Sequence, residues 1–127
     1  MVKDREYFDS LAAIIVGCAY KIGDVLGCGF LEKVYEKSLA LELDSRGLTF
    51  ARQHPIKVYY AGEIVGDFFA DILVENDVVV ELKAVKKIEN IHFAQCQNYL
   101  KATGLKLGLI INFGGEKVEV RRVANGV

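Results

Sequence analysis

The sequence predicts an α/β (α+β) fold in which a mixed β-sheet is flanked by helices. Apolar residues recur every three or four positions over residues 8–26, which is typical of an amphipathic helix. Later segments rich in Val, Ile, Phe and Tyr are separated by turn residues, which is typical of strands. The chain has 127 residues, 52% of them hydrophobic and 26% charged. This is enough for one domain with a real core, so we expect residues 1–127 to form a single domain.

Three helices are expected, over residues 8–26, 31–46 and 91–103. The first should stop at the segment 27–29, where two glycines flank a cysteine. The second should stop at Gly47 and the third at Gly104, because glycine commonly ends helices.

Strands are expected over residues 48–60, 64–74, 78–84, 106–113 and 117–123. The first should be bent or lie at a sheet edge at Pro55, because proline cannot donate to a strand ladder. Gly114-Gly115 predicts a two-residue hairpin turn between the last two strands. The strand–helix–strand order over residues 78–113 predicts a right-handed crossover between parallel strands, whereas the hairpins are antiparallel.

Charge and composition restrict the classes of function. The net charge of −1 provides no overall basic field, so nucleic-acid binding would need a local patch or a bound cation. Three cysteines without a CxxC spacing predict reduced thiols in a cytoplasmic protein. The apolar stretch at residues 11–20 is too short to span a bilayer, and the acids before it do not suit a signal peptide. We therefore expect no membrane association.

Three charged residues interrupt strands that otherwise read as buried: Asp71, Glu81 and Lys83. Glu81 and Lys83 are two apart and share one face of their strand. Whether Asp71 joins them depends on the turn. A two-residue loop would place Asp71 opposite Leu82, whereas a three-residue loop at 75–77 would place it opposite Glu81.

Two carboxylates held opposite each other would repel. At about 4 Å and an effective dielectric of about 20, the repulsion is about 4 kcal/mol. A fold holds such a pair if one acid is protonated or if a divalent cation lies between them, and carboxylate oxygens suit Mg²⁺ or Mn²⁺. Alternatively, the hairpin points these charges into water.

The same residues resemble a known signature. An acid on one strand followed by Glu-x-Lys on the next, here Asp71 and residues 81–83, resembles the PD-(D/E)xK nuclease-like superfamily. Residues 29–35, GFLEKVY, match the G-x-x-E-x-x-Y element of the GxxExxY protein family assigned to it. The stretches LEKVYEKSLALEL, FFADILVENDVVVELKA and QNYLKATGLKLGLIINFG are similar to that family as well. The chain departs at Cys28, where proline is expected, and at Gly23, where histidine is common.

The resemblance implies a restriction-endonuclease-like core and metal-assisted phosphodiester hydrolysis. Asp71, Glu81 and the Leu82 carbonyl would hold Mg²⁺ or Mn²⁺. Lys83 would orient or deprotonate the attacking water, or steady the transition state, although a salt bridge to Glu81 is the alternative. Glu32 would join the metal site from its helix, with a solvated helix residue as the alternative.

Two tyrosines and a glutamine complete the expected site. Gln95 and Tyr99 lie four apart on one helix face and resemble the Q-x-x-x-Y element of RecB-type nucleases. They would contact substrate or support the catalytic residues, unless they are an ordinary polar helix face. Tyr35 would support Glu32 or contact substrate, or else pack in the core.

The expected partner is nucleic acid, DNA or RNA, and the resemblance is compatible with a homodimer. Lys86, Lys87 and His92 would form a phosphate-facing rim or a solvated loop. One alternative is a nuclease-fold module that binds nucleic acid or protein without cutting. Another is an interaction protein whose acids merely decorate an exposed hairpin.

Overall fold

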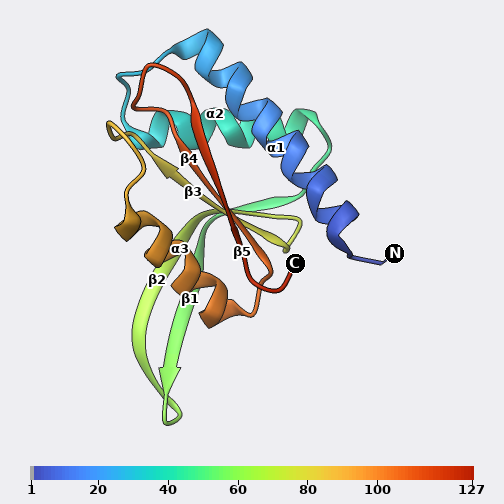
Figure 1. The fold of residues 1–127 in the computed structure, drawn as a ribbon, viewed down its shortest axis with the longest axis vertical. Helices are drawn as coiled ribbons and strands as arrows, with labels where there is room; N and C mark the ends of the chain where they lie inside the picture. Colours follow the sequence, from blue (N-terminus) through green and yellow to red (C-terminus); the bar gives the residue numbers. More distant parts are fainter. Residues whose placement is uncertain (1) are drawn as a thin grey trace.

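The computed structural model describes residues 2–127, and Figure 1 shows how its elements are arranged. The helices are α1 (Arg5–Leu26), α2 (Glu32–Ser45) and α3 (Asn90–Thr103), and the strands are β1 (Phe50–Tyr60), β2 (Glu63–Val74), β3 (Val78–Lys83), β4 (Leu107–Asn112) and β5 (Glu119–Ala124). Each end lies within three residues of the position expected from the sequence. None of the described helices combines the length and the apolar character needed to cross a membrane.

The five strands form one mixed sheet in the order β1-β2-β3-β4-β5. β3 and β4 are parallel, and every other neighbouring pair is antiparallel. The strand–helix–strand segment therefore supplies the parallel pair, and the three hairpins supply the rest. The expected mixed sheet flanked by helices is confirmed.

Helices cover both faces of the sheet, so the central strand β3 is buried on both sides. Val78, Val80 and Leu82 pack with α1 and α2 in one apolar cluster. Val79 packs with α3 in a second cluster on the other face. Successive side chains of a strand point to opposite faces, so the odd-numbered residues of β3 face α3. Glu81 and Lys83 are therefore aimed at the α3 side.

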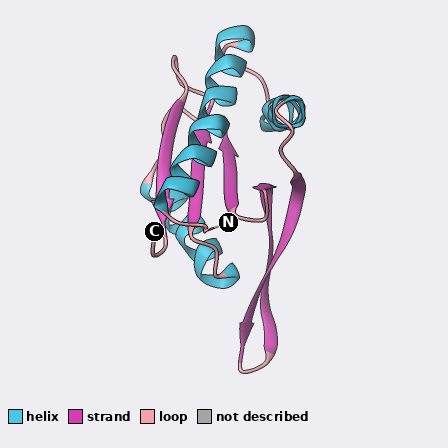
Figure 2. Ribbon diagram, turned by 90° about the vertical axis from the view of Figure 1, so that its right-hand side faces the viewer, coloured by secondary structure: helices cyan, strands magenta, loops and turns pink. Residues whose placement is uncertain are grey.

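The β1–β2 hairpin extends beyond the body of the molecule as an arm (Figures 1 and 2). β1 is an edge strand, as Pro55 predicts, and Pro55 pairs with Phe69. The sharp feature of its backbone lies two residues earlier, where Gln53 has the left-handed φ of 50°. A register shift between Val58 and Tyr59 marks a second irregularity, near the tip of the arm.

The connection between β4 and β5 differs from the expected two-residue turn, because it spans residues 113–118. Gly114 is required there by close packing. A Cβ on Gly114 would lie 2.3 Å from the carbonyl oxygen of Val85 and 2.4 Å from its nitrogen. The glycine pair therefore allows two loops to approach each other and does not form a tight hairpin, a distinction that the dipeptide alone does not reveal.

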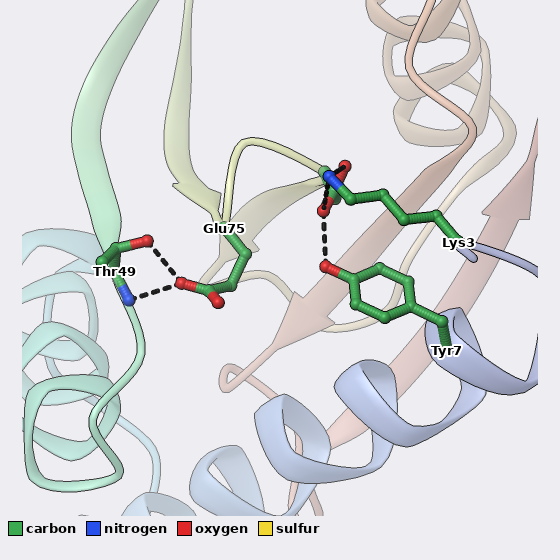
Figure 3. A network of polar contacts seen from close by, with 5 residues as sticks. Lys3, Tyr7, Thr49 and Glu75 are labelled. Carbon is green, nitrogen blue, oxygen red and sulfur yellow. Dashed lines mark hydrogen bonds and ion pairs between the residues drawn. The ribbon is translucent and has the colours of Figure 1, made fainter. Parts of the chain in front are cut away.

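A polar network fixes the turn between β2 and β3 (Figure 3). Glu75 and Asn76 both adopt left-handed backbone conformations, with φ of 53° and 57°. The Thr49 backbone N–H donates to Glu75 Oε2 over 2.7 Å, and the Tyr7 hydroxyl donates to Asp77 Oδ2 over 2.5 Å. Contacts from Thr49, the residue before β1, and from Tyr7 of α1 thus hold a three-residue loop, and this loop sets the pairing of β2 with β3.

Candidate active site

Asp71 and Glu81 are brought together by the register of the β2–β3 hairpin. The pairs are Val74 with Val78 and Ile72 with Val80, so the next pair outward is Asp71 with Glu81. This is the arrangement that a three-residue loop predicts. The two carboxyl groups lie on the α3 side of the sheet, where Lys83 also lies.

Asp71 bonds to the backbone of the neighbouring strand through its side chain. Its Oδ2 accepts a hydrogen bond of 2.7 Å from the Leu82 backbone N–H. Since the N–H and C=O of one strand residue point the same way, the Leu82 carbonyl also faces β2. The Lys83 carbonyl instead accepts from the Phe113 N–H on the β4 side, at 2.9 Å. Successive residues of β3 thus direct their backbone groups to opposite neighbours, and the N–H and carbonyl of Leu82 are on the side of Asp71.

Glu81 is a buried acid with an unsatisfied oxygen. Its residue exposure is 4%, and its Oε1 has no hydrogen-bond partner among the described residues. Burial and the neighbouring Asp71 carboxylate raise the pKa of Glu81 to about 9. Burial raises the pKa of Asp71 as well. Without a cation, the pair therefore retains a proton at neutral pH.

The donor set fits a divalent cation of the Mg²⁺ type. The two adjacent carboxyl groups, one of which has an unpaired oxygen, and the Leu82 carbonyl are hard oxygen ligands. Within residues 2–127 no group of three or more His, Cys, Asp or Glu side chains is close enough to hold a metal. The protein would thus contribute two carboxylates and a carbonyl, and water would complete the shell, which is the usual manner of Mg²⁺ binding.

Lys83 is joined to α3 through a short chain of hydrogen bonds. Its Nζ donates to Gln95 Oε1 over 3.3 Å, and Gln95 Nε2 donates to the Tyr99 hydroxyl over 3.1 Å. No ion pair links Lys83 to Glu81 in the part of the chain that the structure describes. Gln95 and Tyr99 therefore hold the ammonium group of Lys83 on the face shared with the acids.

Glu36, which the sequence analysis did not single out, connects α2 to this group. It is 7% exposed, and its Oε1 accepts from Gln53 Nε2 over 2.6 Å while its Oε2 pairs with Arg52 at 2.9 Å. Gln53 Nε2 also reaches Asp71 Oδ1 at 3.5 Å, and the Glu36 charge adds to the rise in the pKa of Asp71. Glu36 would have been found by its position in the buried face of α2, beside Tyr35 and one turn before Ala40.

Glu32 and Tyr35 make no hydrogen bond to Asp71, Glu81 or Lys83 in the described part of the chain. Glu32 is the first residue of α2, is exposed, and has no hydrogen bond or ion pair with the described residues of the site. Tyr35 is fully buried and stacks on Phe113 with ring centroids 4.3 Å apart. Its hydroxyl donates to the Gly27 carbonyl over 2.6 Å. Of its expected alternatives, the contacts of Tyr35 support packing, and the role of Glu32 stays a prediction.

The three residues expected to form a basic rim lie in different structural elements. Lys86 and Lys87 are exposed in the loop after β3. His92 belongs to a helix cap, because its Nδ1 accepts from the Glu89 N–H over 2.9 Å.

Asn112, a second residue missed by the sequence analysis, anchors the loop that follows Lys83. It is fully buried, accepts from the Val85 N–H over 3.0 Å and donates to the Val85 carbonyl over 2.8 Å. A side chain of β4 therefore holds the segment that follows β3 in place.

Known proteins resemble this chain in sequence and in fold. A family model described as the PD-(D/E)XK nuclease superfamily matches residues 9–123. The resemblance to the GxxExxY family within it stays a prediction. No match to the chain was found among curated proteins.

Two solved structures are similar. The crystal structure of SSO0001 has a TM-score of 0.58 and 14% identity, covering 75% of this chain and 50% of that one. An alkaline exonuclease from Laribacter hongkongensis has a TM-score of 0.55 and 14% identity, covering 98% of this chain and 72% of that one. The chain thus spans only half the length of the first structure. At this identity the likeness shows the fold, and the expected restriction-endonuclease-like core is confirmed.

Proposed function

Because this chain belongs to the PD-(D/E)XK nuclease superfamily, we propose that it hydrolyses phosphodiester bonds in nucleic acid with Mg²⁺ or Mn²⁺. The observation that carries this proposal is the pair Asp71 and Glu81, with its orphaned buried oxygen, beside Lys83 on one sheet face. A purely structural pair of buried acids would be expected to have its oxygens satisfied by hydrogen bonds. The similar alkaline exonuclease agrees with this class of reaction.

Asp71, Glu81 and the Leu82 carbonyl would hold the cation. When bound, a divalent cation lowers the pKa of its water and neutralises charge that develops on the phosphate. Binding requires both carboxyl groups in their ionised form. The proton that the metal-free pair holds at neutral pH must therefore leave Glu81 or Asp71 when the cation binds.

Lys83 would act on the attacking water or on the scissile phosphate. Its ammonium group is presented beside the two acids by Gln95, which is itself held by Tyr99. Gln95 thus acts as a positioning residue for Lys83 or meets the substrate directly. Glu36 supports Asp71 through Gln53, and we propose it as the contribution of α2 to the site.

The experiment is a cleavage assay with end-labelled single- and double-stranded DNA and RNA, with Mg²⁺, with Mn²⁺ and with chelator. Lys83→Ala should lower the cleavage rate by about a hundred- to ten-thousand-fold, as expected for a general acid–base group. Lys106→Ala is the matched control, because Lys106 is exposed and precedes β4 at the end of the parallel pair opposite to Lys83.

Cleavage by the Lys83→Ala variant at the wild-type rate with saturating metal would exclude the catalytic role of Lys83. Absence of cleavage of every substrate by wild-type protein that binds Mn²⁺ would instead support the second candidate, a nuclease-fold module that binds without cutting. One observation favours that candidate. The described residues offer only two clustered acids, so the cation would be held loosely in the free protein.

Residues 1–127 are proposed to act as one nuclease domain, with nucleic acid as its partner. A homodimer and a cytoplasmic location stay predictions.

A further inference from the structure

A groove of about 840 Å³ lies between the β1–β2 arm and α3, next to the candidate active site. We call it the arm groove. Lys57, Tyr59 and Phe68 line it from the arm, and Gln95, Tyr99 and Lys101 line it from α3. None of its lining residues carries a carboxylate.

Two aromatic residues of the arm line the groove and are largely exposed. The exposed fraction is 62% for Tyr59 and 44% for Phe68. Phe68 is held in place on one side by Tyr99, with ring centroids 5.7 Å apart. The Cε2 atom of its ring also lies close to Gly66, where an added Cβ would come within 2.7 Å of it. The exposed face of Phe68 is therefore presented by a fixed ring.

The charge of the groove is locally positive although the whole chain carries −1. Lys101 lines it from α3 and Lys57 from the arm. Lys57 has an ion pair of 3.4 Å with Asp67, and side-chain exposures of 43% and 57% make this a weak surface pair. Lys57 can thus exchange its partner for an anion in the groove.

The groove is continuous with the candidate active site through one side chain. Gln95 lines the groove and accepts a hydrogen bond of 3.3 Å from Lys83 Nζ. Tyr99 lines the groove as well and holds Gln95. A chain lying in the groove would therefore pass directly to Lys83.

From these observations we infer that the arm groove binds single-stranded nucleic acid and leads it to the site. Unpaired bases stack on Tyr59 and Phe68, and phosphates lie beside Lys57 and Lys101. Aromatic platforms combined with a few cations are the usual means of binding single strands. In a duplex the bases are already stacked and paired, and affinity depends on neutralising many phosphates, which a chain with a net charge of −1 does not favour. This substrate class rests on the proposed nuclease function.

The test measures binding without cleavage, in chelator, by the fluorescence anisotropy of labelled oligothymidylate, oligouridylate and a mixed-sequence duplex of equal length. Tyr59→Ala and Phe68→Ala should each weaken single-strand binding by about 5- to 150-fold, the cost of losing one stacked base. The chain provides matched controls. Tyr60 and Phe69 are the sequence neighbours of these residues, are 76% and 53% exposed, and do not line the groove. Tyr60→Ala and Phe69→Ala should leave the affinity unchanged.

The outcomes are separable. Loss of affinity confined to the two groove variants, with both single strands bound more tightly than duplex, supports the inference. Equal affinity in all four variants overturns it, and so does tighter binding of duplex. If the groove variants convert a dimer to a monomer in sedimentation while single-strand affinity is unchanged, the groove is a contact between copies and the inference fails. Tyr59 is largely exposed, so Tyr59→Ala decides the matter if Phe68→Ala unfolds.

Failure of the proposed function gives a different pattern. Groove-dependent binding with no cleavage in Mg²⁺ or Mn²⁺ would support single-strand binding in the groove and contradict the nuclease function. Cleavage that needs Lys83 but is unaffected by Phe68→Ala and Tyr59→Ala would support the nuclease function and contradict single-strand binding in the groove.

Discussion

Half-buried Asp71 and buried Glu81 oppose each other, and the cost of this pair is visible in the pKa of both carboxyl groups. Burial raises the pKa of each carboxyl group, and the Asp71 charge raises that of Glu81 further. A fold selected for stability alone would replace one of them, since like charges opposite each other are destabilising. Their presence is understandable if a cation takes up the charge.

Asp71→Asn should therefore remove the response to metal while preserving the fold. The amide oxygen can still accept the hydrogen bond from the Leu82 N–H, which Asp71 accepts at 2.7 Å. We expect the melting temperature of the wild type to rise with MgCl₂ or MnCl₂, because a ligand bound only by the folded state stabilises it. In Asp71→Asn this rise should be absent, and the metal-free melting temperature should equal or exceed that of the wild type.

Asp67→Asn is the control for this experiment. Asp67 is an exposed acid on the same strand, four residues from Asp71, and its only ion pair among the described residues is with Lys57. It should respond to metal as the wild type does. An undiminished response in Asp71→Asn would place any bound cation away from the β2–β3 hairpin.

The raised pKa of Glu81 predicts the direction in which stability changes with pH. In the unfolded chain Glu81 loses its proton near pH 4.5, whereas in the metal-free folded protein it keeps the proton up to about pH 9. The folded state thus binds more protons between these values, so the free energy of unfolding should fall as the pH rises. The slope is at most about 1.4 kcal/mol per pH unit for one group.

Urea denaturation in chelator at several pH values between 5 and 9 measures this slope, with Glu81→Gln as the comparison. The variant should show a flatter profile, because its amide does not titrate. Parallel profiles for the two proteins would mean that Glu81 is ionised in the folded state without metal.

At the scale of the element, the loop after β3 depends on close packing against the β4–β5 connection. Gly114→Ala should be strongly destabilising, because its Cβ would lie 2.3 Å and 2.4 Å from Val85 backbone atoms that cannot move aside alone. Overpacking of this kind typically costs about 1–3 kcal/mol. Cleavage should fall as well, because the displaced segment directly follows Lys83.

Gly115→Ala provides the matched control in chemical denaturation. A Cβ there would meet the Lys86 carbonyl oxygen at 3.4 Å, an ordinary contact. Its stability should stay close to that of the wild type. If both variants lose the same stability, the cause is a general intolerance of the loop to alanine and not the contact with Val85.

The elements themselves were predictable because each is encoded locally. Helix ends carry glycines with left-handed φ at Gly47 and Gly104, and apolar periodicity marks the helix faces. Close approach between loops is not encoded in this way. The pair Gly114-Gly115 reads as a hairpin turn, yet Gly114 is placed by its contact with Val85, a residue distant in sequence.

The candidate site residues that lie on strands could be predicted from strand geometry. Asp71, Glu81 and Lys83 lie on one face because strand alternation and loop length fix them. The burial of Glu36 does not follow from such rules alone, since Glu32 and Glu36 are one turn apart and tertiary packing buries Glu36. A motif match identifies the helix, whereas the depth of each side chain depends on how that helix is set against the sheet.

At the scale of the whole molecule, a net charge of −1 means that nucleic acid must be attracted locally, by few cations. The arm groove presents two, Lys57 and Lys101. For single strands, each phosphate contact adds about 0.7 to the steepness of log affinity against log salt concentration. We therefore expect a shallow slope of about −1 to −2 for wild-type protein.

Lys101→Ala should make that slope shallower by about 0.7 while leaving the preference for single strands over duplex unchanged. Lys106→Ala is the control, because Lys106 is also exposed and lies outside the groove. Anisotropy titrations of labelled oligothymidylate across a series of KCl concentrations in chelator measure both slopes. A wild-type slope several times steeper, unaffected by Lys101→Ala, would mean that the backbone is held by another basic surface. The phosphate-binding part of the groove model would then be wrong, whereas the stacking on Tyr59 and Phe68 would still be decided by their own variants.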